Sequence, residues 1–124
     1  MLTSVVRLLR RGKGRGDRVG IFDEPRDQVR RFSEARDWLR YHTPKNLAMA
    51  LVGEAGELAA EFQWLTAEES FIGASDQEAW SAVQGEMADV FIYLLRLSDV
   101  LAIDLEVAVR AKLDLNERRF PIGD

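Results

Sequence analysis

Two acidic pairs lie inside stretches of sequence that are otherwise apolar. Glu54 and Glu57 are three residues apart in "ALVGEAGELAAEFQW", and Glu61 follows four residues later. Glu86 and Asp89 repeat the three-residue spacing in "GEMADVFIYLL". Residues three or four apart lie on one side of an α-helix. Two such helices facing each other would therefore bring Glu54, Glu57, Glu86 and Asp89 into one pocket.

Carboxylates gathered away from bulk water need a compensating cation, because like charges and desolvation both oppose ionisation. The chain has no cysteine and one histidine, His42, which favours oxygen coordination of Mg²⁺, or of Mn²⁺, over a zinc or copper site. A ferritin-like di-iron site is disfavoured, since it needs a Glu-x-x-His pair on each of two helices. The alternative is that these acids lie on solvated faces and pair with Lys or Arg.

A magnesium ion held by carboxylates typically handles phosphate, because its open positions accept waters and phosphate oxygens. The sequence therefore predicts a phosphate ester or anhydride as substrate. The segment "GKGRGDR" lacks the spacing of a phosphate-binding P-loop. Gly53, Gly56 and Gly85 fall inside predicted helices, where each glycine costs about 0.5–1 kcal/mol. Close approach of another helix or of a ligand would explain them.

The elements that must position these residues are helices, because apolar residues recur at helical spacing and no strand-like alternation is found. Thr43 with Pro44 and then Asp104 are predicted helix starts, and Thr66 with Glu69 has capping-box spacing. Ser75 with Glu78 has the same spacing. The predicted helices span about 27–41, 44–65, 77–102 and 105–120, which indicates an all-α, four-helix-bundle fold.

The charge of the chain is unevenly distributed. Residues 1–20 hold six Lys or Arg against Asp17, whereas the formal net charge of the whole chain is −4. We interpret residues 1–20 as a basic, flexible extension and residues 21–124 as one helical domain. A nucleic-acid-binding or targeting tail is the alternative. Without cysteines, a secretory signal or a run of ~18–20 apolar residues, a cytoplasmic protein with no membrane contact is expected.

A family resemblance follows from longer segments. "RDWLRYHTPKNLAMALVGEAGELAAEFQW" and "EMADVFIYLLRLSDVLAIDLEVAVRAKLDLNERRFP" resemble the MazG-like superfamily of all-α nucleoside triphosphate pyrophosphohydrolases, and most closely its dCTP pyrophosphatase type. The resemblance covers about residues 27–121. It implies hydrolysis of a (d)NTP, in particular dCTP or a modified pyrimidine deoxynucleotide, to the monophosphate and pyrophosphate. It also implies a homo-oligomer, either a dimer or a tetramer.

The resemblance also implies roles for individual residues. Glu54, Glu57, Glu86 and Asp89 match the Mg²⁺ ligands, and Glu54, or otherwise Glu57, would act as base towards the attacking water. The positions matching contacts to base and sugar are Trp38, His42, Asn46, Trp64 and Tyr93, and those matching phosphate contacts are Lys112 and Asn116. In an oligomer, Trp64 would reach a nucleotide bound by a neighbouring subunit.

Other interpretations remain open at this point. The same architecture would serve a MazG-like hydrolase of other NTPs or a phosphoribosyl-ATP pyrophosphatase. A noncatalytic helical interaction or regulatory protein is a different class, and the intact acidic set argues against it. A nucleic-acid binder acting through the basic extension is less favoured, and would show binding that weakens steeply with salt.

Overall fold

The computed structural model describes residues 19–123, and the protein is all-α as predicted. Residues 1–18 of the predicted basic extension lie outside the described residues, and only Val19 and Gly20 lie within them. Within them, no helix is both long and apolar enough to cross a membrane. The chain forms α2 (Asp23–Glu34), the 3₁₀ helix η2 (Leu39–Tyr41), α3 (Pro44–Ala60), α4 (Gln77–Leu101) and α5 (Leu105–Arg119).

The starts of the three longest helices follow from capping side chains. Thr43, Asp76 and Asp104 each accept a hydrogen bond from the backbone N–H three residues later, at 3.2, 3.2 and 3.1 Å. The predictions for Thr43 and Asp104 are confirmed. The predicted capping box of Ser75 with Glu78 is wrong, because Asp76 provides the cap one residue later.

The connection between α3 and α4 contains the other predicted capping box. Thr66 Oγ1 accepts from the backbone N–H of Glu69 at 3.2 Å, and a carboxylate oxygen of Glu69 accepts from the backbone N–H of Thr66 at 2.9 Å. This reciprocal pair confirms the prediction. Helix α3 itself ends at Ala60, earlier than the predicted end near residue 65.

The first helix differs from the prediction over residues 27–41. It begins earlier, at Asp23, and ends at Glu34. Asp37 has a φ of 56°, and its N–H and that of Trp38 donate to the carbonyls of Glu34 and Ser33, both at 3.0 Å. These are the two bonds of a Schellman motif. A left-handed aspartate therefore ends α2, where a glycine would have been the usual signal.

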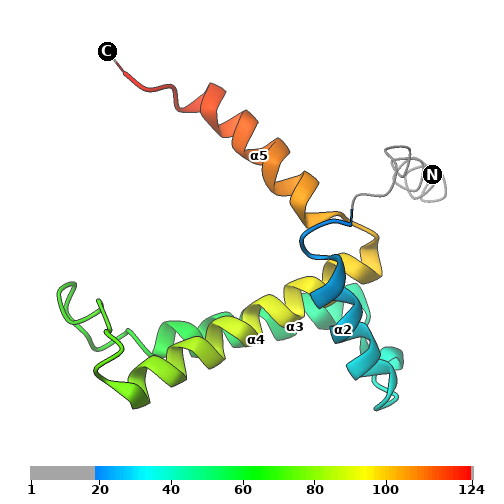
Figure 1. Cartoon of the computed structure of the whole chain (residues 1–124), viewed down its shortest axis with the longest axis horizontal. Helices are drawn as coiled ribbons and strands as arrows, with labels where there is room; N and C mark the ends of the chain where they lie inside the picture. Colours follow the sequence, from blue (N-terminus) through cyan, green and yellow to red (C-terminus); the bar gives the residue numbers. More distant parts are fainter. Residues whose placement is uncertain (1–18, 124) are drawn as a thin grey trace.

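Helices α3 and α4 lie side by side as an antiparallel pair, and α2 packs on α4 (Figure 1). Leu47 of α3 and Leu95 of α4 are the only buried hydrophobic residues among those described. Helix α5 leaves the end of α4 and runs away from α2 and α3, and it buries no residue. One chain thus supplies four α-helices, but α5 does not pack alongside the other three.

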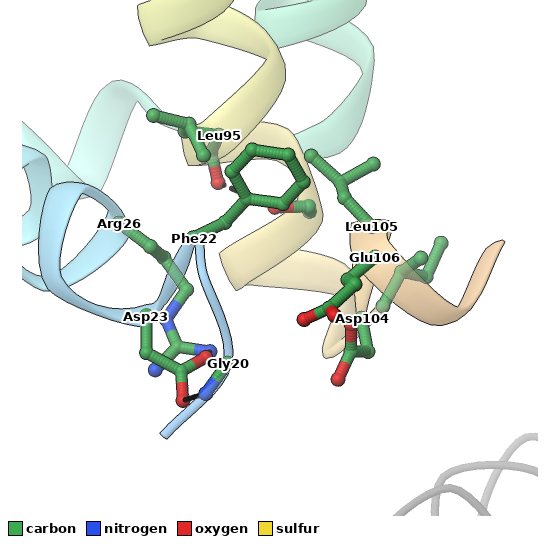
Figure 2. A pocket seen from close by; sticks show the side chains of 10 residues that line it. Gly20, Phe22, Asp23, Arg26, Leu95, Asp104, Leu105 and Glu106 are labelled. Atoms are coloured by element: carbon green, nitrogen blue, oxygen red, sulfur yellow. Dashed lines mark hydrogen bonds and ion pairs between the residues drawn. The ribbon is translucent and has the colours of Figure 1, made fainter. Parts of the chain in front are cut away.

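The corner between α2, α4 and α5 is held by local polar bonds (Figure 2). The backbone N–H of Gly20 donates to Asp23 at 2.8 Å, and that of Ile21 donates to Glu106 at 3.3 Å. Phe22 meets Phe91 edge to face, with ring centroids 5.5 Å apart. The cavity at this corner measures only about 10 Å³, which is room for one water molecule. It is too small for a nucleotide.

The helix glycines lie on open surfaces. A Cβ built on Gly53, Gly56 or Gly85 would meet nothing within 4 Å. The close helix approach predicted at these glycines is therefore not found within one chain. Contact with a ligand or with another subunit would still explain them.

Candidate metal and nucleotide site

Three of the predicted carboxylates converge between α3 and α4. Glu54, Glu57 and Glu86 each offer an oxygen that lies within 4.8 Å of the other two. Ligand oxygens around one octahedral Mg²⁺ are about 2.8–4.2 Å apart, given Mg–O distances of about 2.0–2.1 Å. Small side-chain rotations would bring the observed group to that spacing. These three acidic residues could therefore hold a metal ion.

Two oxygens in this cluster are inaccessible to water and have no hydrogen-bond donor among the described residues: Oε2 of Glu54 and Oε2 of Glu86. Desolvation raises the pKa of both carboxyl groups, and the negative charges of Glu57 and Asp89 raise it further. Buried polar atoms normally have a partner. A cation would satisfy these oxygens and relieve the repulsion, so the residues present fit a divalent metal.

Asp89 lies at the edge of the cluster. Its side chain is exposed, and it is not among the three residues whose oxygens approach most closely. Its charge nevertheless acts on both Glu54 and Glu86. The structure thus places Asp89 beside the group without showing it as a ligand.

A pocket of about 400 Å³ opens one helical turn away from the carboxylates, within the usual range for small-molecule sites. Ala50 precedes Glu54 by four residues on α3, and Tyr93 follows Asp89 by four residues on α4, a rise of about 6 Å in each case. The residues that line the pocket are Trp38, Tyr41, His42, Asn46, Leu47, Ala50 and Tyr93. Four of the five predicted base and sugar contacts therefore meet here.

Local contacts fix the side chains around this pocket. Trp38 meets Phe32 edge to face, with ring centroids 5.7 Å apart, and the guanidinium of Arg36 lies 3.5 Å from the centre of the Phe32 ring. The side-chain amide of Asn46 donates to the backbone carbonyl of Tyr41 at 3.0 Å, which leaves the Asn46 amide oxygen as an available acceptor. An aromatic face and polar edges thus share one concave surface.

Three predicted site residues are not brought to the pocket within one chain. Trp64 lies in the turn after α3 and is 87% exposed. Lys112 and Asn116 lie on α5, which runs away from the α3–α4 pair (Figure 1). Their predicted roles need a different neighbour from the one that their own chain provides.

Sequence reasoning missed several residues that the structure places at or behind the pocket. Tyr41, Leu47 and Ala50 line it, and no spacing in the sequence marked them as distinct from core residues. Arg96 and Asp99 lie behind it, joined at 2.5 Å. A signal for this pair did exist, because two opposite charges three residues apart interrupt the apolar face of α4.

Comparison with known proteins finds relatives named dCTP pyrophosphatase 1. The chain is 45% identical over 95 residues to human dCTP pyrophosphatase 1, covering 73% of this chain and 53% of the human protein. The mouse protein of that name is 44% identical over 91 residues. The chain spans about half the length of these curated relatives. No family model matches the chain.

A solved structure matches the chain over nearly its whole length. The crystal structure of a pyrophosphatase from Archaeoglobus fulgidus superposes with a TM-score of 0.76 at 40% sequence identity, covering 86% of this chain and 97% of the archaeal one. Fold and site define an all-α protein with a carboxylate cluster beside a nucleoside-sized pocket. The chain belongs to the MazG-like pyrophosphatase family, as its sequence motifs predicted.

Proposed function

We propose that the protein hydrolyses a nucleoside triphosphate, dCTP or a modified pyrimidine deoxynucleotide, to the monophosphate and pyrophosphate. The observation that carries the proposal is the placement of an aromatic, nucleoside-sized pocket one helical turn from carboxylates with unpaired buried oxygens. A nucleoside bound there would direct its phosphates towards the acidic cluster. The relatives named dCTP pyrophosphatase support the choice of substrate.

The side chains divide the work of binding and of chemistry. Trp38 offers an aromatic face for the base, while His42, Asn46 and Tyr93 offer polar edges. Glu54, Glu57, Glu86 and Asp89 would hold Mg²⁺, or Mn²⁺, which neutralises phosphate oxygens and lowers the pKa of a bound water. Glu54 accepts a proton from the attacking water. The water oxygen bonds to the α-phosphorus, the bond from that phosphorus to the bridging oxygen breaks, and pyrophosphate leaves.

The proposed active form is a homo-oligomer, a dimer or a tetramer. Helix α5 exposes Val107, Val109, Leu113 and Leu115, each at least 45% accessible in the single chain. Exposed apolar residues gathered on one unpacked helix indicate an interface. A second copy covering α5 would also bring Lys112 and Asn116 to a neighbouring pocket, where Lys112 would pair with phosphate.

The experiment that tests the proposal is a substrate panel. The purified protein is incubated with the dNTPs, the NTPs, 5-methyl-dCTP and phosphoribosyl-ATP, with Mg²⁺, Mn²⁺ or EDTA, and the products are separated by ion-exchange chromatography. We expect monophosphate and pyrophosphate, fastest from dCTP or 5-methyl-dCTP and none in EDTA. Release of orthophosphate would contradict the reaction, and turnover of phosphoribosyl-ATP alone would reassign the substrate. No turnover at all would favour a noncatalytic protein.

A further inference from the structure

His42 is hydrogen-bonded to a partly buried ionic network behind the pocket. The Nε–H of Arg96 donates to Nδ1 of His42 at 3.0 Å, and Arg96 is only 7% exposed. On its other side Arg96 donates to Asp99 at 2.5 Å. Asp99 in turn accepts two hydrogen bonds from Arg30 of α2, at 2.7 and 2.5 Å. The chain Arg30–Asp99–Arg96–His42 thus connects α2 and α4 to the edge of the pocket.

The direction of the last hydrogen bond determines the state of the imidazole. Arginine remains protonated in proteins and has donors but no acceptor, so Nδ1 must accept with its lone pair. A neutral His42 then carries its proton on Nε2. Nε2 has no hydrogen-bond partner between residues 19 and 123, and it is not among the buried unpaired atoms. It is therefore a solvent-accessible donor on a residue that lines the pocket.

Protonation of Nδ1 would place its N–H against the N–H of Arg96 and destroy this hydrogen bond. Burial lowers the pKa of His42, and the positive charge of Arg96 lowers it further. Arg96 of α4 contacts the imidazole directly, and Asp99 pairs with Arg96 on its other side. Tyr41 and Tyr93 line the same pocket as His42. Asp99 already accepts hydrogen bonds from Arg30 and Arg96, so its negative charge does not offset the positive charge of a protonated imidazole.

We propose that the Asp99–Arg96 pair is a positioning device that holds His42 as the neutral Nε2–H tautomer and aims this donor at the base of the nucleotide. The inference rests on the proposed function, because it takes the pocket to be the nucleoside site. A fixed donor favours a base edge with acceptors. Cytosine presents two adjacent acceptors, N3 and O2, whereas N3 of uracil or thymine carries a proton.

The first test does not depend on turnover. His42 is the only histidine in the chain, so a ¹⁵N-histidine-labelled protein gives one pair of imidazole nitrogen signals. We expect Nδ1 to show the signal of an unprotonated nitrogen and Nε2 that of a protonated one. We also expect addition of dCMP, without metal, to shift the Nε2 signal. A protonated Nδ1, or an Nε2 signal that dCMP does not move, would overturn the proposal.

The second test separates positioning from structural support. Arg96→Met should mix the two tautomers and raise KM for dCTP about tenfold while kcat stays within about twofold. Arg96→Lys, which keeps a donor, should recover part of the KM and most of the Nε2–H signal. Arg31→Met, at an exposed position in the last turn of α2, is the control. An unchanged KM in Arg96→Met, or an equal loss in both Arg96 variants, would contradict the positioning role.

The two proposals can fail separately. If the wild-type protein turns over no nucleotide, the proposed function fails, while the histidine signals and the dCMP titration still decide the positioning role. If circular dichroism shows that Arg96→Met does not fold, the positioning role is tested by the ¹⁵N-histidine spectrum of the wild type and by the KM of Arg96→Lys. If the protein hydrolyses the expected substrates but His42 is protonated on Nδ1, the proposed function is supported and the positioning role of Asp99–Arg96 is contradicted.

Discussion

Without a bound metal, desolvation and repulsion by the negative charges of Glu57 and Asp89 raise the pKa of both Glu54 and Glu86. Each also has a buried oxygen without a hydrogen-bond donor. A divalent ion that binds only the folded protein stabilises it, by about 1.4 kcal/mol at ten times the Kd. We therefore expect Mg²⁺ to raise the Tm of the wild type by several degrees. Glu86→Gln should respond much less and lose about 100-fold or more in kcat.

Thermal melts and steady-state kinetics with and without Mg²⁺ measure both effects. The matched control is Glu78→Gln in the exposed first turn of α4, which should behave as wild type. In EDTA, Glu86→Gln should be at least as stable as wild type, because one of the repelling charges is gone. A full Mg²⁺ response in Glu86→Gln would argue against the carboxylate cluster as the metal site.

Trp38 is the aromatic face of the pocket, and it remains 44% exposed in the free protein. Stacking of a base on an aromatic side chain contributes about 1–3 kcal/mol, and about 1.4 kcal/mol corresponds to a factor of ten. Trp38→Ala should accordingly raise KM for dCTP about tenfold. Trp80→Ala, which removes a comparably exposed indole outside the pocket, should leave KM near the wild-type value. Equal effects of the two substitutions would exclude stacking by Trp38.

The carboxylate cluster could be predicted from the sequence because each acidic pair is defined by residues close together in the chain. Two acids three residues apart in an apolar helix identify a shared face, and a second such helix supplies the opposite wall. The His42–Arg96 bond was not predictable in this way, since it joins residues 54 positions apart and depends on how η2 meets α4. The roles of Trp64, Lys112 and Asn116 rest on family resemblance and stay predictions.

Among the helices, the ends differ in how clearly the sequence marks them. Side-chain caps at Thr43 and Asp104 are visible as residue types. The end of α4 is less visible, because Ala102 adopts a left-handed conformation with φ 55°, which non-glycine residues avoid at a cost of about 1–2 kcal/mol. The direction of α5 follows from this turn, and the sequence has no glycine at this position from which the turn could be predicted.

Replacing Ala102 with glycine removes that conformational strain. Glycine loses about 0.4–1 kcal/mol through the greater freedom of the unfolded chain, so we expect Ala102→Gly to raise the free energy of unfolding by about 0.5 kcal/mol. Ala108→Gly, inside α5, should instead lower it by about 1 kcal/mol. Urea unfolding followed by circular dichroism compares the two. Destabilisation by both substitutions would show that Ala102 does not hold the left-handed turn.

Asp99 anchors α2 to α4 through Arg30 and Arg26, and it also pairs with Arg96 of its own helix. Burial alone would raise the pKa of Asp99, but the hydrogen bonds from Arg30 and the charges of the three arginines hold it below its ordinary value. A buried pair that loses one partner costs about 3 kcal/mol or more. Asp99→Asn should lose about that much stability at pH 7, and the exposed Asp114→Asn should lose little.

The pH dependence of this difference has a defined sign. A carboxyl group whose pKa is lowered by folding stabilises the protein above its unfolded pKa and loses that contribution as the pH falls through the folded value. The gap between wild type and Asp99→Asn should thus stay constant from pH 7 to about pH 5 and shrink below about pH 4. Urea titrations across this range measure it, and a gap that widens on acidification would contradict the assignment.

For the molecule as a whole, a single chain leaves two parts of its proposed site apart. The carboxylates lie between α3 and α4, whereas Lys112 lies on α5 and lines neither the nucleoside pocket nor the corner cavity. The sequence predicts the helices but not their partner, because apolar faces are equally suited to the same chain or to a second copy. Mixing subunits with different substitutions tests whether Lys112 serves the site of its own chain or that of a second copy.

Lys112→Ala and Glu86→Gln should each lack most activity as separate proteins. If Lys112 serves the neighbouring subunit, unfolding and refolding an equal mixture gives mixed dimers in half of the population, and one of their two sites is intact. Activity should then return to about one quarter of the wild-type value. A mixture of Glu54→Gln with Glu86→Gln is the matched control and should stay inactive, because both substitutions lie in the same cluster. Failure of the first mixture to recover, with mixed dimers confirmed by native mass spectrometry, would place Lys112 in the site of its own chain or outside the site altogether.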